Sequence, residues 1–388
     1  PPHHQDLIIG QTPQDQRMTT PIPIAVIAGQ LVVGGAERQL YLWLANLDQR
    51  KYKPVVLTLN PGHGDHWEKP VESLGIPLLR VPKNANRLLR LFEIVKLLRP
   101  YKPELLHGWH FFASAYAGLA ARLLGVPCVG GIRSSFQPDR RDLEIFLVHH
   151  FCDVVVANSN TAAQAYRLSL GKLSQQVRTV PNAIQESFAH REKIREHLSA
   201  QYGLEDSDLW ICSIGRMEPT KRFDVLLELA ALLKPTHKNF QFILIGEGSE
   251  KARLEAISAD YGVTDCVRFL GEVPNASEWM KGMDIFCFPS MNEGLPNVVM
   301  EAAAAGLPVV AWAMPFIEEL LPDRSMARLS PPGDVESMLE HLVELLDSKP
   351  LREGLGAAAK KQILENFSLA RFIDGMSSVY DFTLELGR

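Results

Sequence analysis

The chain has 388 residues, of which 46% are hydrophobic and 22% are charged. This is the composition of a folded globular protein, and it excludes disorder over the bulk of the chain. No run of about 18 apolar residues occurs, which excludes a membrane-spanning helix. The five cysteines lie far apart without a CxxC pair, which argues against a zinc site or disulfide framework and favours a reducing cytoplasm. The length suggests two domains.

The net charge of −5 is unevenly distributed along the chain. Residues 1–190 carry 20 Lys and Arg against 14 Asp and Glu, whereas residues 191–388 carry 20 against 31. The first half is therefore basic and the second acidic. This asymmetry indicates that the first half faces something anionic, although chance drift of surface charge would also produce it.

Residues 1–18 show no usable periodicity and no signal-peptide pattern, so we expect a flexible leader, with Met18 as a candidate natural start. Beyond it, short apolar runs alternate with helical patterns such as Arg87–Leu98 and Ala113–Leu124. The strands predicted in the first half are Ile24–Ala28, Val55–Leu59, Pro77–Val81, Leu105–His107, Pro127–Gly131, Val154–Ala157 and Val177–Val180.

The alternation restarts in the second half of the chain. The strands predicted there are Leu209–Ile214, Phe240–Ile245, Val267–Phe269, Ile285–Phe288 and Pro308–Ala311. This pattern predicts an α/β fold of two doubly wound, Rossmann-like domains with parallel sheets. We expect an N-terminal domain over 19–187, a C-terminal domain over 188–367 and a closing helix over 368–388.

Ligands of open parallel sheets bind beyond the carboxyl ends of the strands, so the cleft between two such domains is the expected site. Gly34 and Gly35 follow the first strand and open a helix, where glycine lets backbone N–H groups approach an anion. An ordinary tight turn would also need glycine. Neither the GxGxxG fingerprint nor the GxxxxGK[ST] P-loop occurs.

In the second half, Arg216 and Lys221 follow the strand that ends at Gly215. Two cations at the carboxyl edge of a strand suit a diphosphate, because arginine offers a fork of donors and lysine a point charge. Gly246 follows the next strand and permits close approach of a ligand. The alternatives are an exposed loop with solvated cations and a simple strand-to-helix turn.

The strongest indication comes from residues 284–301. A buried-type strand is followed by a polar loop with Glu293 and Gly294, and Pro296 is placed in the first helical turn. We then expect Glu293 at the helix mouth and Glu301 two turns inside, about 12 Å further along the axis. The two carboxylates would hold the hydroxyls of a sugar and a ribose, and helix N–H groups would bind the phosphate between them.

Five segments resemble the motifs of the retaining glycosyltransferases of family four, which have the two-domain fold called GT-B. They are GGAER (34–38), GRMEPTKRFDVLLE (215–228), LIGEGSEKARLE (244–255), VRFLGEVPN (267–275) and EGLPNVVME (293–301). The last carries the family's signature of two glutamates separated by seven residues. The resemblance extends along nearly the whole chain and implies two domains facing across a cleft, with the closing helix crossing back to the first.

The resemblance also implies roles for single residues. Arg216 and Lys221 would neutralise the donor diphosphate, Glu293 would contact the transferred sugar, and Glu301 would contact the ribose. Phe269 would lie near the base. The remaining expected substrate contacts are Gly34, Gly35, Gly215, Gly246, Gly294, Leu295, Pro296 and Asn297.

The match is weaker in the first domain. Many relatives have a histidine where this chain has Arg133, and a subgroup of polysaccharide-building relatives has an arginine there, with a tryptophan like Trp109. We expect Arg133 to contact substrate and His110 to lie near the reacting centre. The alternative for His110 is a purely structural role, which is common for a histidine after a strand.

The resemblance implies a retaining hexosyltransferase that needs no metal ion or other cofactor. No DxD-type acidic cluster follows a strand, so cationic side chains would stabilise the leaving diphosphate. The expected donor is UDP-glucose or a similar UDP-hexose, and the expected acceptor is a glycan or a lipid-linked acceptor in polysaccharide biosynthesis. Two alternatives stay open, namely a non-catalytic nucleotide-sugar-binding subunit of a larger synthase and a sugar-nucleotide 2-epimerase.

Residues 87–102 combine apolar side chains with five Lys and Arg in a helical pattern. Such a basic amphipathic helix is able to contact anionic lipid, although a core-packed helix with a solvated basic face has the same pattern. We therefore expect a cytoplasmic protein with peripheral contact at the inner membrane face, and no nucleic-acid partner.

Overall fold

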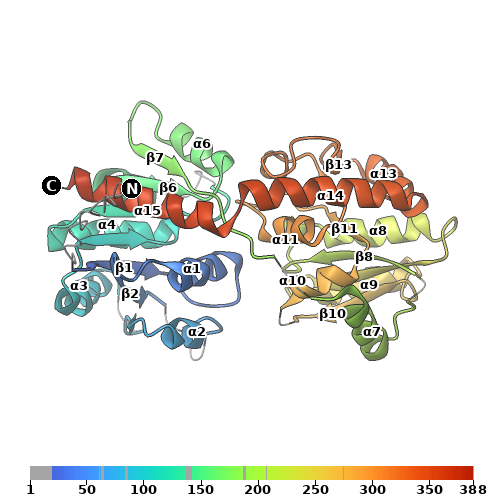
Figure 1. Ribbon diagram of the computed structural model, residues 1–388, viewed down its shortest axis with the longest axis horizontal. Coiled ribbons are helices and arrows are strands. Elements are labelled where there is room, and N and C mark those ends of the chain that lie inside the picture. The colour runs from blue at the N-terminus through green and yellow to red at the C-terminus, as the bar shows by residue number, and fades with distance from the viewer. Residues whose placement is uncertain are drawn as a thin grey trace, which may run out of the picture.

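The computed structural model describes residues 20–60, 62, 65–83, 86–136, 142–186, 189–206, 208–273 and 275–387. The leader expected over residues 1–18 lies outside this range. The described chain forms two lobes that lie side by side, each built on a parallel sheet covered by helices on both faces (Figure 1). The predicted fold class is therefore confirmed. All five cysteines are buried free thiols, and those of Cys128 and Cys152 lie 3.6 Å apart.

The N-terminal lobe contains a seven-stranded sheet of order β3-β2-β1-β4-β5-β6-β7. Its central strand β1 pairs in parallel with β2 and β4, so that Val26 lies between Val56 and His107. All seven strands predicted for this half are present. Their bounds are β1 Ile22–Ala28, β2 Tyr52–Thr58, β3 Leu78–Arg80, β4 Leu105–Gly108, β5 Cys128–Ile132, β6 Val154–Ala157 and β7 Gln176–Thr179.

The alternating side chains of β1 show how helices cover both faces of this sheet. Ala25 and Ile27 pack into the core beneath α3, α4, α5 and α6, whereas Ile24 and Val26 pack into the core beneath α1, α2 and α15. The central strand β1 is thus sandwiched between two apolar layers, whereas the edge strands β3 and β7 are partly exposed. The helices are α1 Gly35–Asn46, α2 Glu68–Ser73, α3 Arg87–Leu98, α4 Phe111–Leu124, α5 Asp142–Phe151, α6 Asn160–Ser169 and α15 Leu369–Leu386, with the 3-10 helix η1 Arg99–Tyr101 directly after α3.

The C-terminal lobe contains a six-stranded parallel sheet of order β10-β9-β8-β11-β12-β13. Its strands are β8 Leu209–Ile214, β9 Phe240–Ile245, β10 Val267–Gly271, β11 Ile285–Phe288, β12 Val309–Trp312 and β13 Ala327–Ser330. The five predicted strands are present, and β13 was missed. This edge strand is short and half-exposed in its middle, with a charged residue, Arg328, among its four positions. It therefore lacks the apolar run that marks the central strands.

Helices also cover both faces of the second sheet. One face is covered by α8 Phe223–Leu233, α9 Lys251–Asp260 and α13 Val335–Asp347. The other face packs against α7 Arg191–Tyr202, α11 Asn297–Ala305, α12 Pro315–Glu318 and α14 Lys349–Asn366, with α10 Ala276–Trp279 and the 3-10 helix η4 Met280–Gly282 beside them. A further 3-10 helix, η3 Pro219–Lys221, lies between β8 and α8.

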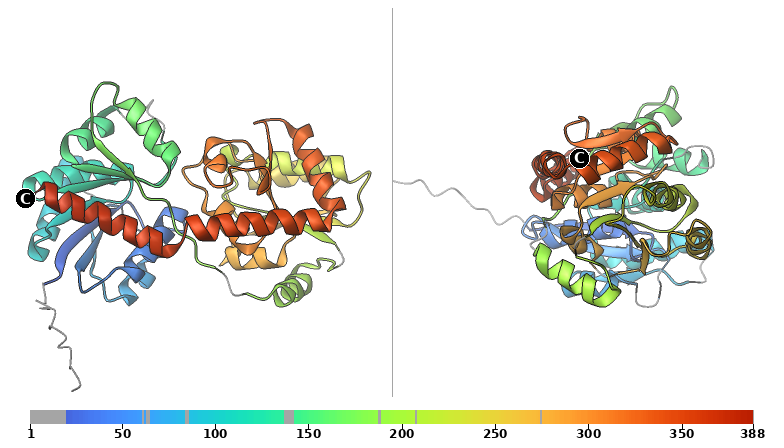
Figure 2. Two further views of the ribbon diagram at one scale, coloured as in Figure 1. Left: turned by 45° about the horizontal axis from the view of Figure 1, so that its top comes forward. Right: turned by 90° about the vertical axis from the view of Figure 1, so that its right-hand side faces the viewer.

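The chain passes between the lobes twice, and the two crossings touch each other. Ile184 in the first crossing forms a parallel bridge with Ser368 in the second, and its N–H donates to the carbonyl of Phe367 at 3.0 Å. After this point α15 follows α14 almost end to end and lies along the N-terminal lobe (Figure 2). Phe372 and Met376 of α15 pack into that lobe's core.

Candidate functional site

The loops that follow β1 and β5 in the N-terminal lobe meet the loop that follows β11 in the C-terminal lobe. A Cβ placed on Gly294 would lie 2.6 Å from the carbonyl carbon of Ser134, which comes just after β5. A Cβ on Gly35 would lie 2.5 Å from the side-chain nitrogen of Asn297. The carboxyl ends of both sheets therefore face one another, and the predicted site residues Gly35, Gly294 and Asn297 lie at one interlobe junction.

The helix that carries Glu301 begins later than predicted. Pro296 has an extended backbone, with φ −74° and ψ 104°, and α11 begins at Asn297. Proline disfavours a helical conformation in the residue before it, so Leu295 lies outside the helix, buried in the lobe's core. Glu293 therefore lies in the loop and not at a helix mouth, and the predicted separation by eight helical residues is wrong.

Glu301 is buried on α11 and forms an ion pair with Arg38 of α1, from the other lobe. Only 8% of the Glu301 side chain is exposed. Burial raises the pKa of its carboxyl, and the Arg38 guanidinium opposes that rise. A carboxylate in this position needs a partner, and without a ligand Arg38 provides it.

Asn297, the first residue of α11, connects the two lobes through both ends of its side-chain amide. Its nitrogen donates to the carbonyl of Gly35 at 3.1 Å, and its oxygen accepts from the side chain of Asn182 at 2.8 Å. Asn182 belongs to the first interlobe crossing. The start of α11 is thus fixed against the glycine loop of the N-terminal lobe, where Gly34 is the residue that precedes α1.

Lys221 and Glu293 also lie together, although 72 residues separate them. Lys221 ends the 3-10 helix η3, and its ammonium donates to Glu293 Oε1, which also accepts from the hydroxyl of Ser290 at 3.0 Å. Both charged side chains are more than four-fifths buried. A cation and a carboxylate that share one polar cluster at a strand end are placed to contact a phosphate and a sugar hydroxyl respectively.

Arg216 is exposed just after β8, and its side chain has no hydrogen-bond or ion-pair partner among the described residues. Gly215 and Gly246 pack the ends of β8 and β9 against each other, because a Cβ on Gly246 would overlap the carbonyl of Gly215. Gly246 also has φ +139°, which disfavours any other residue. Phe269 of β10 is half-buried against the lobe's core. The ligand contacts of these four residues stay predictions.

His110 precedes α4 and is held by two neighbours. Its Nδ1 accepts the backbone N–H of Gly29 at 3.3 Å, and its Nε2 lies 3.2 Å from Glu37 Oε1. Because Nδ1 acts as the acceptor, the neutral ring carries its proton on Nε2 and donates it to the carboxylate. The imidazole is thus oriented by the GGAER segment itself, at the end of β4.

Arg133 lies after β5 as predicted, and its guanidinium is buried. It stacks 4.2 Å from the ring of Trp109 and also faces Phe372 and Met376 of α15. Two of its nitrogens, Nε and Nη1, have no partner in the described residues. Burial lowers the pKa of Arg133 to about 10. Its contact with substrate stays a prediction.

Sequence reasoning missed three residues that complete the junction, namely Glu37, Arg38 and Asn182. Glu37 and Arg38 belong to a segment that was recognised, but their partners are 73 and 263 residues away. A signal was present for Arg38, because a glutamate inside the small apolar helix at Glu301 requires a counter-charge. No signal in the sequence distinguishes Asn182 from an ordinary linker residue.

A further carboxylate contact joins the lobes away from these residues. Glu319, at the end of α12, accepts from the backbone N–H groups of Asn160 and Thr161 at 2.7 and 3.1 Å, and from the hydroxyl of Thr161 at 3.0 Å. It therefore caps helix α6 of the opposite lobe, where unpaired N–H groups and the helix dipole favour a negative charge.

Two further structural findings concern metals and membranes. Within the described ranges, no group of three or more His, Cys, Asp or Glu side chains is arranged to hold a metal ion. None of the helices in the described part of the chain has both the length and the hydropathy of a membrane span.

Two family models match the chain, one in each lobe. The model described as "Glycosyltransferase Family 4" matches residues 33–188, and the model described as "Glycosyl transferases group 1" matches residues 194–362. Both the glycine loop and the segment from Glu293 to Glu301 lie within these matches.

Known proteins resemble the chain over most of its length. It is 24% identical to the lipopolysaccharide core biosynthesis glycosyltransferase LpsE of Rhizobium meliloti, over 88% of this chain and 94% of that protein. It is 26% identical to the 2-deoxystreptamine glucosyltransferase of Streptomyces kanamyceticus, over 66% of this chain and 72% of that protein. Among solved structures, HepE of Anabaena in complex with UDP-glucose superimposes with a TM-score of 0.82 at 18% identity, covering 93% of this chain and 99% of that one. The fold is therefore that of GT-B enzymes.

Proposed function

Because the chain belongs to the glycosyltransferases, with a family 4 region followed by a group 1 region, we propose that it transfers a hexose from UDP-glucose or a similar UDP-hexose to a glycan or lipid-linked acceptor. We further propose that the transfer retains the anomeric configuration and serves polysaccharide biosynthesis at the cytoplasmic face of a membrane. The relative named for lipopolysaccharide core biosynthesis and the structural neighbour in complex with UDP-glucose support this choice of donor and pathway class.

The observation that carries the proposal is the ion pair that Arg38 and Glu301 form between the lobes, together with the Lys221–Glu293 pair of the C-terminal lobe. Glu301 is buried in the middle of α11, and Lys221 and Glu293 are clustered beyond the ends of the neighbouring strands β8 and β11. A bound nucleotide would take the place of Arg38 at Glu301, so that the carboxylate accepts hydrogen bonds from the ribose hydroxyls. Glu293 would accept hydroxyl protons of the transferred sugar.

The difficult step is cleavage of the bond between the anomeric carbon and the phosphate oxygen, which leaves negative charge on the diphosphate. Arg216 is free to contact that diphosphate, and Lys221 needs only to turn from Glu293 toward it. Two cations beside the diphosphate would stabilise the developing negative charge without a metal ion. The acceptor oxygen then bonds to the anomeric carbon, and its proton passes to the leaving phosphate. His110, fixed by Glu37, would position the acceptor hydroxyl or the sugar beside this bond.

The first experiment measures thermal shift with UDP-glucose, UDP-galactose, UDP-N-acetylglucosamine, GDP-mannose and ADP-glucose. A ligand present at 100 times its Kd adds about 2.7 kcal/mol of stability, so the true donor stands out from the panel. Glu301→Gln serves as the matched variant, because it keeps the side-chain shape but weakens acceptance from ribose. No shift with any UDP-sugar would reject the proposed donor class.

The second experiment follows the donor without an acceptor by proton NMR. Slow release of free sugar, first as the α-anomer, supports a retaining transferase in which water replaces the acceptor. Binding without turnover would instead indicate a nucleotide-sugar-binding subunit. Conversion of the donor to its C2 epimer would indicate an epimerase.

A further inference from the structure

The outer surface of α3, α4 and α5 forms one continuous layer on the N-terminal lobe. Arg90 of α3 lies 5.7 Å from the ring of Tyr116 on α4, and Gly118 of α4 approaches Phe151 of α5 so closely that a Cβ would lie 2.8 Å from it. Each helix follows a parallel strand and precedes the next one, so all three run in the same direction. Their first turns lie on the side of the interlobe junction, and their last turns lie at the far end of the lobe.

The outward faces of these helices are apolar near the junction. Phe92 of α3 is 63% exposed, and Leu89 one turn before it is 47% exposed. On α5, Leu143 and Phe146 are 60% and 52% exposed, three residues apart and thus on the same face. The helix α4 lies between α3 and α5. Its outward stripe consists of Phe112, Tyr116 and Leu119, which are partly buried, and Leu123, which is exposed.

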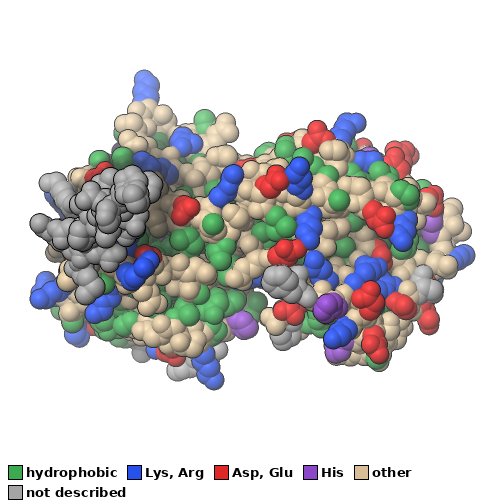
Figure 3. Space-filling view, viewed as in Figure 1, with side chains coloured by type: hydrophobic (Ala, Val, Ile, Leu, Met, Phe, Trp, Pro, Cys, Tyr) green, Lys and Arg blue, Asp and Glu red, His purple; other side chains and the backbone are tan. Residues whose placement is uncertain are grey.

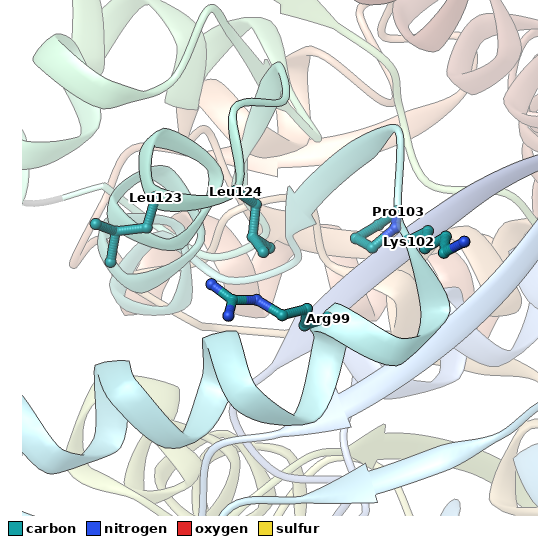
Figure 4. Close-up of a pocket in the computed structure, with 5 residues that line it drawn as sticks. All are labelled: Arg99, Lys102, Pro103, Leu123 and Leu124. Carbon is teal, nitrogen blue, oxygen red and sulfur yellow. The ribbon is translucent and has the colours of Figure 1, made fainter.

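The far end of the same layer is basic. Lys96 and Arg99 continue the stripe of α3 at helical spacing, and Lys102 follows. Lys96 also contacts the carboxylate of Glu93 at 3.4 Å. A pocket of about 320 Å³ lies there, lined by Arg99, Lys102, Pro103, Leu123 and Leu124. Figure 4 shows Arg99 extending from the end of α3 toward the leucines at the end of α4. Within the described residues, neither Arg99 nor Lys102 forms an ion pair.

We propose that the layer of α3, α4 and α5 is a docking surface for an anionic phospholipid bilayer. Phe92, Leu123 and Phe146 would enter the boundary between headgroups and acyl chains, while Arg99 and Lys102 bind lipid phosphates. Exposed aromatic and leucine side chains bordered by unpaired cations are the pattern of proteins that lie on anionic membranes. A second copy of the chain is the alternative occupant, but it would not supply the phosphates that Arg99 and Lys102 would bind on a bilayer.

The charge of the two lobes favours the same orientation. The first half of the chain is basic and the second half acidic. Acidic side chains are concentrated on the C-terminal lobe in the view of Figure 3. An anionic surface therefore attracts the N-terminal lobe and repels the other.

The docking surface leads directly to the interlobe junction. The stripe of α4 begins at Phe112, whose ring stacks 5.9 Å from that of His110. A lipid-linked acceptor lying in the membrane would therefore reach His110 along α4. This extension rests on the proposed transferase function, whereas binding to the bilayer itself does not.

The test is co-sedimentation of the full chain with vesicles of phosphatidylcholine, with and without about 30% phosphatidylglycerol. Each cation near an anionic surface contributes roughly five-fold in partitioning, so the triple variant Lys96→Gln, Arg99→Gln, Lys102→Gln should bind about 100-fold more weakly. The double variant Phe92→Ser, Phe146→Ser should bind vesicles at least about ten-fold more weakly, because each substitution removes a large apolar side chain from the lipid.

The matched control is Arg50→Gln, Lys53→Gln, Lys69→Gln, which removes the same charge from exposed positions of the same lobe in the segments around β2 and α2. We expect it to bind vesicles within a factor of about five of wild type, because these positions lie outside the docking layer. Three results would each overturn the proposal. They are an equal loss of vesicle affinity in both triple variants, equal binding of the wild type to neutral and anionic vesicles, and no vesicle binding at low salt. A dimer in solution that Phe92→Ser and Phe146→Ser dissociate would assign the surface to a second copy.

The two proposals fail separately in these experiments. Release of free sugar from UDP-glucose in the absence of acceptor involves none of the docking residues, so all variants should keep the wild-type rate and an unchanged Tm. If the protein binds anionic vesicles but does not turn over any nucleotide-sugar, the docking surface is supported and the proposed transferase function is rejected.

Discussion

Gly294→Ala tests whether the interlobe junction is the working site. A Cβ on this residue would lie 2.6, 2.8 and 3.0 Å from the carbonyl carbon, Cα and oxygen of Ser134 in the opposite lobe. Ordinary contact begins at 3.4 Å, and backbone atoms cannot rotate away. The lobes must therefore separate by about 0.8 Å at this point. Misplacement of reacting groups by about 1 Å costs on the order of 100-fold in rate. We expect kcat to fall by about that factor.

The assay compares kcat for sugar release from the donor, UDP binding by calorimetry and the Tm. Because the clash lies between lobes, each lobe keeps its own core and the Tm should change little. Gly354→Ala is the matched control, since nothing lies within 4 Å of its Cβ on helix α14 of the same lobe. A Gly294→Ala variant with wild-type turnover would refute the idea that catalysis needs this approach of the lobes.

Three further variants test charged groups of the proposed site and of the contacts between the lobes. Arg216→Ala should lower kcat by about 10²–10³, because it removes a cation that would contact the leaving diphosphate. The Tm should stay constant, because Arg216 is exposed and its side chain has no partner among the described residues, and Arg253→Ala on the outer helix α9 is the control. Wild-type turnover in Arg216→Ala would reject its role at the diphosphate. Burial raises the pKa of the Glu301 carboxyl above its ordinary value of 4.5. The folded state therefore binds this proton more tightly than the unfolded state, and the resulting stabilisation is complete below pH 4.5 and is lost as the pH rises. The Tm of Glu301→Gln relative to wild type should therefore increase from about pH 4 to about pH 7, and a constant difference would contradict this. Glu319→Gln should weaken the cap on α6 by roughly 0.5–1 kcal/mol, because the amide lacks the negative charge of the carboxylate. The contact between the two lobes should loosen, and small-angle scattering would detect this as a larger radius of gyration.

The secondary structure was largely predictable because it depends on local patterns. Apolar runs such as Val154–Ala157 and Phe240–Ile245 are strands buried on both faces. Their own residues are enough to predict them as strands, without knowing which strands they pair with. The strand at Ala327–Ser330 was missed because an edge position permits polar and charged side chains. The start of α11 was placed four residues early because Pro296 suits both a first helical turn and the extended position before it.

The sequence by itself determined which residue types lie at the strand ends, because glycine, arginine and glutamate after an apolar run are visible at short range. Only the tertiary structure decided which of them face each other. Arg38 and Glu301 lie in different lobes and meet because the carboxyl ends of two sheets point at one junction. Likewise, the exposed residues of α3 and α5 form one surface only because the order of the strands places α4 between them. Contacts of this kind depend on chain topology and on the packing of the lobes, which no local pattern records.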